Sequence, residues 1–101
     1  MHLEEIDRII EEYEKYNLIF SDASLKKIRD GCESWKNDWV IVFKKQLRRI
    51  KKEEGSPARD RENGIRVTYP LVKNQYMAIF YKKQTNGSYY IYNFKLGIME
   101  I

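Results

Sequence analysis

Apolar residues recur at three- and four-residue steps through the first half of the chain, which is the spacing of one face of an α-helix. In the first series these positions are Leu3, Ile6, Ile9, Ile10, Tyr13 and Tyr16. In the second series they are Leu25, Ile28, Cys32, Trp35, Trp39, Phe43, Leu47 and Ile50. The pattern therefore predicts one helix at about 3–16 and another at about 24–53.

The second helix has two weak places and one alternative. Gly31 and the pair Asn37-Asp38 resist helix formation, so the helix can break at either place. Residues 39–43 are β-branched and aromatic, which is typical of a strand. We favour a helix there because the helical spacing continues on both sides. A strand at 39–43 followed by a helix at 44–53 remains the alternative.

Between the two helices, residues 18–20 form a short apolar connector. Ser21, Asp22 and Ser24 follow it, and their short polar side chains are good N-caps. The second helix is therefore expected to begin within these residues.

The last third of the chain favours strands at 65–70, 76–84 and 88–96, where β-branched and aromatic residues are frequent. Asn86-Gly87, between the last two, is a strong hairpin signal, and as a two-residue loop it places Tyr81 opposite Tyr92. The sequence thus predicts a single α+β domain spanning 1–101. Its helices pack on a three-stranded antiparallel β-meander, with a charged loop at 53–64.

This register divides the side chains of the hairpin between two faces. One face is apolar and is expected to join the helices in a core of Trp35, Trp39, Phe43, Leu47, Ile79, Tyr81, Tyr92 and Phe94. The other face carries Tyr76, Phe80, Lys82, Tyr89 and Lys95, joined by Arg66 and Thr68 from the first strand. Aromatic rings between cations suit single-stranded nucleic acid. A covering helix or a second subunit would also explain the rings.

Charge is concentrated in residues 44–52, where six of nine residues are basic. The cations are Lys44, Lys45, Arg48, Arg49, Lys51 and Lys52, and the following loop adds Arg59 and Arg61. Such a patch can bind phosphates or an acidic protein surface, or it can be a solvated helix face. The net charge is +4, yet residues 1–22 hold seven acids against two bases. We expect this acidic first helix to pack near the basic body and offset its field, rather than to act as a gate.

Several classes of chemistry lack the residues they need. His2 is the only histidine and Cys32 the only cysteine, so histidine-dependent catalysis and a thiolate metal site are disfavoured. Cys32 lies on the apolar stripe and is expected in the core. The longest apolar run, 39–43, is far too short to span a membrane. We therefore expect no catalytic residue, metal or cofactor, no membrane association and a cytoplasmic location.

The order of Asp38–Phe43, a basic helix, Ile65–Tyr69, Met77–Tyr81 and Tyr90–Phe94 resembles the RelE/ParE toxin superfamily, with its strand, helices and three-stranded meander. The RelE members of that superfamily cut messenger RNA on ribosomes. The resemblance implies a ribonuclease that works through Lys, Arg and Tyr groups. The groups available for it are Arg66, Lys82, Tyr89, Tyr92 and Lys95. The short helical region and the extra N-terminal helix depart from that pattern.

The sequence is thus interpreted as a small basic binding protein rather than an enzyme, one that engages nucleic acid or a protein that handles nucleic acid. A phage or mobile-element inhibitor fits this profile. The alternatives are a RelE-like ribonuclease toxin and an oligomerising module that buries its second sheet face. The oligomeric state and any base preference stay open.

Overall fold

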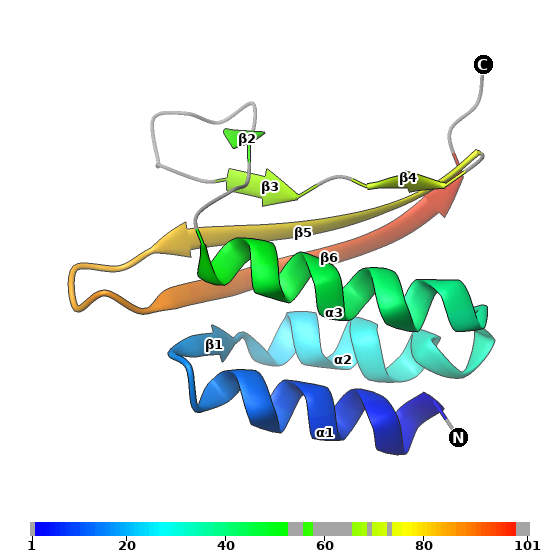
Figure 1. The fold of residues 1–101 in the computed structure, drawn as a ribbon, viewed down its shortest axis with the longest axis horizontal. Helices are drawn as coiled ribbons and strands as arrows, with labels where there is room; N and C mark the ends of the chain where they lie inside the picture. The colour runs from blue at the N-terminus through cyan, green and yellow to red at the C-terminus, as the bar shows by residue number, and fades with distance from the viewer. Residues whose placement is uncertain (1, 53–55, 58–65, 69, 73, 99–101) are drawn as a thin grey trace.

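The computed structural model describes residues 2–52, 56–57, 66–68, 70–72 and 74–98 (Figure 1). Helices and strands within this part form an α+β fold. The helical elements are α1 (His2–Glu14), α2 (Asp22–Gly31), the short 3-10 helix η1 (Cys32–Ser34) and α3 (Asn37–Lys51). The strands are β1 (Leu18–Phe20), β2 (Ser56–Pro57), β3 (Arg66–Thr68), β4 (Leu71–Val72), β5 (Gln75–Lys83) and β6 (Tyr89–Ile98).

The helix predicted over 24–53 breaks in the middle. α2 ends at Gly31, η1 follows, and an extended backbone at Trp35 and Lys36 leads into α3. A continuous helix over 24–53 would be about 45 Å long, whereas the longest dimension of the molecule is 35 Å. The break lets α3 run back alongside α2 (Figure 1). Residues 39–43 are helical, so the strand alternative is wrong.

The beginning of α2 follows the expectation from its sequence. Ser21 is the N-cap, and its hydroxyl oxygen accepts a hydrogen bond of 3.0 Å from the backbone N–H of Ser24. α1 matches the helix expected at about 3–16, although it begins one residue earlier and ends two residues earlier, and Asn17 follows it with a positive φ of 69°. Asn tolerates this left-handed conformation better than most residues do.

The sheet is mixed, which corrects the prediction of a three-stranded antiparallel meander. β3, β5 and β6 pair antiparallel as expected, but residues 18–20 form the strand β1 parallel to β6 rather than a connector. The strand order is β1-β6-β5-β3-β2, with β4 also paired to β5. Three residues are too few to show a strand period, so the sequence carried no signal for β1.

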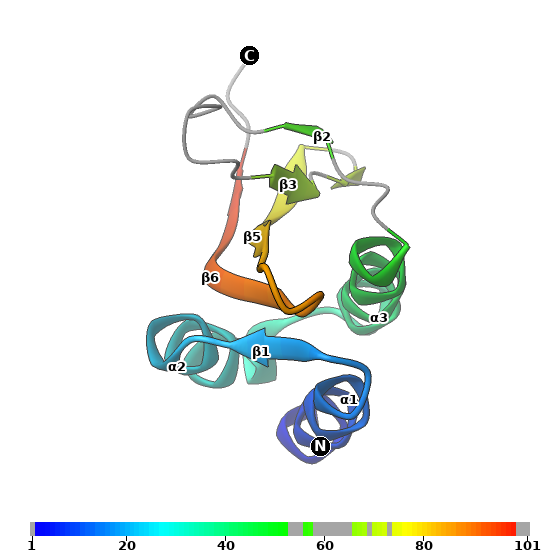
Figure 2. The same ribbon diagram turned by 90° about the vertical axis from the view of Figure 1, so that its left-hand side faces the viewer.

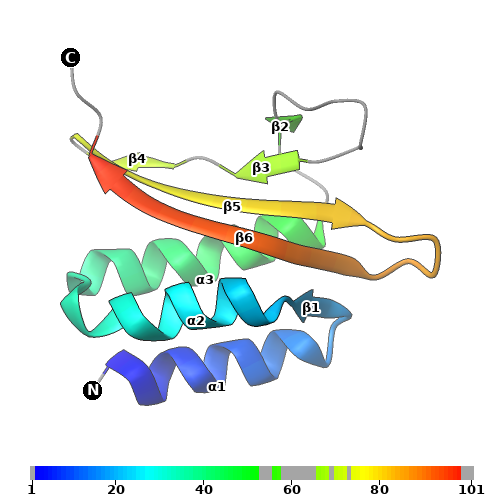
Figure 3. The ribbon, with the colours of Figure 1, turned by 180° about the vertical axis from the view of Figure 1, so that it is seen from behind.

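Where β1 ends, helix α2 lies along the same edge of β6 (Figure 3). The Ser21 hydroxyl donates to the Tyr92 carbonyl at 3.0 Å, and the Ser24 hydroxyl donates to the Ile91 carbonyl at 3.1 Å. Further along, Lys27 Nζ donates to Asn93 Oδ1 at 2.7 Å. The two serine bonds satisfy backbone carbonyls that an open strand edge would expose.

The hairpin turn is one residue longer than predicted. Gln84 and Ser88 close a three-residue loop in which the Gly87 N–H bonds to the Gln84 carbonyl at 3.0 Å. Gly87 has a φ of 89°, the left-handed conformation of a type I turn followed by a bulge. Asn86 Oδ1 accepts bonds from the backbone and hydroxyl of Ser88. The prediction of a two-residue Asn86-Gly87 loop is therefore wrong.

A register shift compensates for the longer turn. Next to the turn, Tyr81 faces Ile91, whereas farther away Ile79 faces Phe94, as predicted. The shift falls between Phe80 and Tyr81 on β5, which leaves Tyr92 as an extra residue on β6. The half of the hairpin away from the turn was thus predicted correctly, and the half beside the turn was not.

The core lies between the helices and the inner face of the sheet (Figure 2). Trp35 packs on Phe43 and Phe94, each at a ring-centroid distance of 5.5 Å. Seven of the eight core residues expected from the sequence are buried; the exception is Tyr92, which is half-buried on the other face.

Cys32 is fully buried in this core, as predicted. Burial, with smaller contributions from the charges of Glu33 and Asp7, raises the pKa of its thiol above the ordinary value. In the described part of the chain, no helix has the length and apolar character needed to cross a membrane.

Candidate nucleic-acid interface

The sheet surface that faces away from α3, here called the outer face, carries Tyr76, Phe80, Lys82, Tyr90, Tyr92 and Lys95. Along β5, Met77, Ile79 and Tyr81 are buried on the inner side. Of the alternate residues, Ala78 is buried, Tyr76 and Phe80 are half-buried and Lys82 is exposed. Figures 2 and 3 show the helices on the inner side and along the lower edge of the sheet. Within the described residues, no helix lies across the outer face.

The bulge decides which tyrosines of β6 reach this face. Tyr89 and Ile91 turn inward, and Tyr89 packs against Tyr81 with ring centroids 6.2 Å apart. Tyr90 and Tyr92 are half-buried on the outer face, where the Tyr92 ring lies 5.9 Å from that of Phe80. The placement of Tyr89 on this face from the sequence is therefore wrong, because the longer turn reverses the alternation beside it.

Tyr76 and Gly97 form the other end of the outer face. They are paired across β5 and β6, and a Cβ atom on Gly97 would lie 2.6 Å from the Tyr76 hydroxyl oxygen. The Tyr76 ring therefore lies directly over the glycine backbone. Leu71, which is opposite Tyr76 on β4, is 52% exposed and extends the apolar surface.

The charged side chains that the strands place on the outer face are all cations. Residues 65–98 contain no Asp or Glu. Lys82 is paired with Tyr90, Lys95 is paired with Ala78, and Lys27 reaches the margin through Asn93. Four rings and three ammonium groups therefore share one surface. Rings of this kind stack on bases, and ammonium groups contact phosphates.

Two residues expected on this face lie elsewhere. Arg66 is opposite Tyr81 and Thr68 is opposite Ile79, so both belong to the inner side of β3. Arg66 is exposed there, whereas Thr68 is buried. Val67, opposite Phe80, is the residue of β3 on the outer face.

The cations of the 44–52 run do not form a single free surface. Lys44 lines a hollow together with Glu4, Glu5 and Glu12 of α1. The Lys51 ammonium group lies 3.7 Å from the centroid of the Tyr16 ring. The acidic first helix thus packs beside the basic helix, as the charge pattern suggested.

Three exposed cations, Lys45 and Arg48 of α3 and Lys52 at its C-cap, are here called the α3 ridge. Arg49 is half-buried and donates to Gln46 Oε1 at 3.5 Å. Arg59 and Arg61 lie outside the described residues. Because α3 covers the inner face of the sheet, its ridge and the outer face lie on opposite sides of the molecule (Figure 2). The structure does not bring these two predicted groups together.

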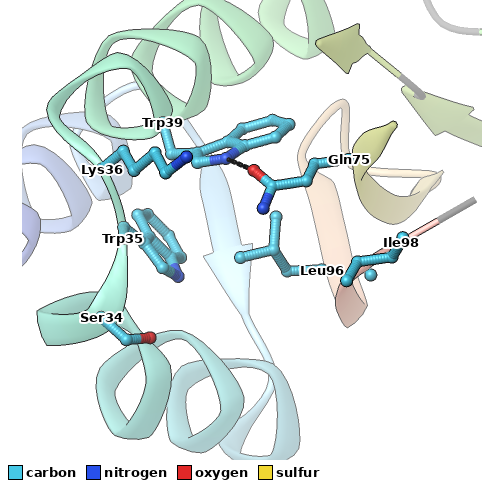
Figure 4. Close-up of a pocket in the computed structure, with 8 residues that line it drawn as sticks. Ser34, Trp35, Lys36, Trp39, Gln75, Leu96 and Ile98 are labelled. Carbon is cyan, nitrogen blue, oxygen red and sulfur yellow. Dashed lines mark hydrogen bonds between the residues drawn. The ribbon is translucent and has the colours of Figure 1, made fainter. Parts of the chain in front are cut away.

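A groove that sequence reasoning missed lies between η1 and the end of β6 (Figure 4). It consists of two connected hollows of about 220 and 510 Å³ that share Ser34, Trp35 and Leu96. The Trp39 indole N–H donates to Gln75 Oε1 at 2.8 Å in its wall. The helical spacing identified both tryptophans only as core residues, since their contact with the end of β6 depends on the break before α3.

Among the described residues, no group of three or more His, Cys, Asp or Glu could hold a metal ion. The segment compared with the first strand of RelE/ParE toxins is part of helix α3. Comparison of the chain with protein-family models, with curated proteins and with solved structures found no match.

Proposed function

We propose that this protein binds single-stranded nucleic acid on the outer face of its sheet. The observation that carries the proposal is the grouping of Tyr76, Phe80, Tyr90 and Tyr92 on a surface without acidic residues. Each ring is only half-buried, so part of its surface is accessible to a base. Stacking on such a ring contributes about 1–3 kcal/mol per base and requires no particular sequence.

The lysines supply the second part of the binding energy. Lys82 and Lys95 are exposed and stand beside the rings, where they can reach the phosphates of a strand stacked on them. A single strand suits this face better than a duplex does, because the rings need unpaired bases.

The α3 ridge is a weaker candidate than the outer face. Its neighbours on α1 are acidic, and Glu5 lines the same hollow as Lys45 and Arg48. These carboxylates reduce the positive field that a phosphate backbone would meet. We therefore assign the nucleic acid to the outer face and treat the ridge as a solvated helix surface.

Fluorescence anisotropy with labelled single-stranded RNA and DNA tests the proposal. Tyr92→Leu and Phe80→Leu keep an apolar side chain but remove the ring, and each should weaken binding about 5- to 100-fold. Tyr16→Leu is the matched control, since Tyr16 is 48% exposed, follows the end of α1 and contacts Tyr13 and Lys51 rather than residues of the outer face. Lys82→Ala should reduce the slope of log affinity against log salt by about 0.7.

Two results would contradict this function. One is a wild-type protein that binds neither RNA nor DNA single strands at low salt. The other is a dimer in sedimentation experiments whose dissociation is promoted by Tyr92→Leu, which would identify the outer face as the interface of an oligomerising module. Comparing matched RNA and DNA strands shows which of the two is preferred.

A further inference from the structure

The groove beside η1 has one narrow compartment with both apolar and polar side chains in its walls. Trp35, Trp39, Leu96 and Ile98 line it, and its volume is about 220 Å³. Pockets for drug-sized ligands measure roughly 300–1,000 Å³. This compartment therefore has room for a single ring or side chain (Figure 4).

Gln75 presents hydrogen-bond donors to this compartment. Its Oε1 accepts the Trp39 indole N–H at 2.8 Å. Because an indole nitrogen only donates, the bonded atom of Gln75 is the oxygen, and the amide nitrogen occupies the other position. Figure 4 shows this nitrogen on the side toward Leu96. Its two N–H groups have no acceptor among the described residues.

Trp35 adds a third donor. Its side chain is 4% exposed, yet no described residue accepts a hydrogen bond from its indole N–H. The nitrogen lies on the edge of the ring turned toward the groove (Figure 4). An indole nitrogen only donates hydrogen bonds, so this N–H can donate to an acceptor of a ligand or of water in the groove.

The charged residues around the groove also favour a ligand that carries acceptor groups. Lys36 lines the narrow compartment, and Lys27 and Lys95 line the wider one, where Asp30 is the acidic residue present. Lys95 also belongs to the outer face, and Gly97, which lies under the Tyr76 ring, lines the compartment. The groove is thus continuous with the end of the outer face.

We infer that this groove binds one uracil or thymine nucleotide at the end of the strand. The inference rests on the proposed function, because it extends the same single strand beyond Tyr76. Uracil and thymine present carbonyl oxygens where cytosine and adenine carry an amino group, and those oxygens match the donors of Gln75 and Trp35. The narrow compartment takes the base, and the lysines of the groove contact its phosphate.

Base preference in the anisotropy assay tests this inference. The wild-type protein should bind oligo-U about 5- to 10-fold more tightly than oligo-C of the same length, as one or two hydrogen bonds would give. Gln75→Glu keeps an oxygen for the Trp39 N–H but removes the amide donors, so the ratio should fall to about one. Gln84→Glu, in the exposed turn, makes the same change of charge and should keep the ratio.

A second readout follows the two tryptophan indole signals in ¹H–¹⁵N spectra of the wild-type protein. Uridine 5′-monophosphate should shift the Trp35 signal, assigned with Trp35→Phe, more than the Trp39 signal. An unchanged U-to-C ratio in Gln75→Glu, or unmoved indole signals at saturating nucleotide, would contradict nucleotide binding in the groove. Neither result would affect the proposal that the outer face binds a single strand. If the nucleotide binds in the groove but Tyr92→Leu leaves the affinity for oligonucleotides unchanged, the outer-face proposal is wrong instead.

Discussion

At the scale of single residues, Thr68 differs from the rest of the core. Its side chain is 2% exposed, and its Oγ1 has no hydrogen-bond partner among the described residues. The neighbouring strand places it opposite Ile79, on the inner side of the sheet. A buried hydroxyl without a partner retains the cost of removing it from water, about 1–3 kcal/mol.

Thr68→Val should therefore stabilise the protein. A methyl group of nearly the same size replaces the hydroxyl, so the free energy of unfolding should rise by about 1 kcal/mol in urea titrations. Thr85→Val, at an exposed position in the hairpin turn, is the control and should change it by less than about 0.5 kcal/mol. A loss of stability in Thr68→Val would show that the hydroxyl has a partner.

At the scale of elements, the junction between α2 and β6 determines the form of the hairpin. Ser21 and Ser24 bond to the carbonyls of Tyr92 and Ile91, which are the residues at the bulge. Ser24 is fully buried there, and its hydroxyl also lies 2.9 Å from the carbonyl of Ser21. The first turn of α2 thus holds the part of β6 in which the register changes.

Ser24→Ala should weaken this junction. We expect the free energy of unfolding to fall by about 1 kcal/mol, because the bonds from the buried hydroxyl to β6 and to Ser21 are lost. Ser34→Ala is the matched control: the Ser34 hydroxyl donates to Gly31 at 2.7 Å but is exposed to water. Urea unfolding of both variants measures the difference, and equal effects would argue against a structural role for the α2–β6 bonds.

At the scale of the whole molecule, the outer face and the α3 ridge point in opposite directions. A short strand bound on one side cannot contact the other side at the same time. The basic run between 44 and 52 is the most prominent charge pattern in the sequence, yet the fold places part of it beside the acidic α1. Binding measurements can therefore separate the two surfaces.

Two double variants with the same change in net charge make this comparison. Lys82→Glu with Lys95→Glu should weaken binding of a short single strand at least 10-fold, because both cations lie on the outer face. Lys45→Glu with Arg48→Glu should change it by less than about threefold, through the long-range field alone. The opposite ranking in anisotropy titrations would assign the nucleic acid to the α3 ridge.

Local patterns predicted those features that depend on neighbouring residues. The spacing from Leu3 to Tyr16 predicted α1, and Ser21 was among the N-caps expected for α2. β1 was missed because its three residues become a strand only by pairing with β6. Among the candidate site residues, Phe80 and Lys82 were placed correctly on the outer face, whereas Tyr89 was not, because its face depends on the length of the turn.

The sequence by itself determined the α+β class, most of the core and the acid-free character of the strands, since these follow from periodicity and residue type, whereas it left residues 39–43 open between helix and strand. Only the tertiary structure decided which tyrosines face outward, through a turn and a bulge held by Ser21 and Ser24 of the α2 junction. It alone placed Trp35 and Gln75 around one groove, because contacts between distant segments depend on how the helices fold back on the sheet.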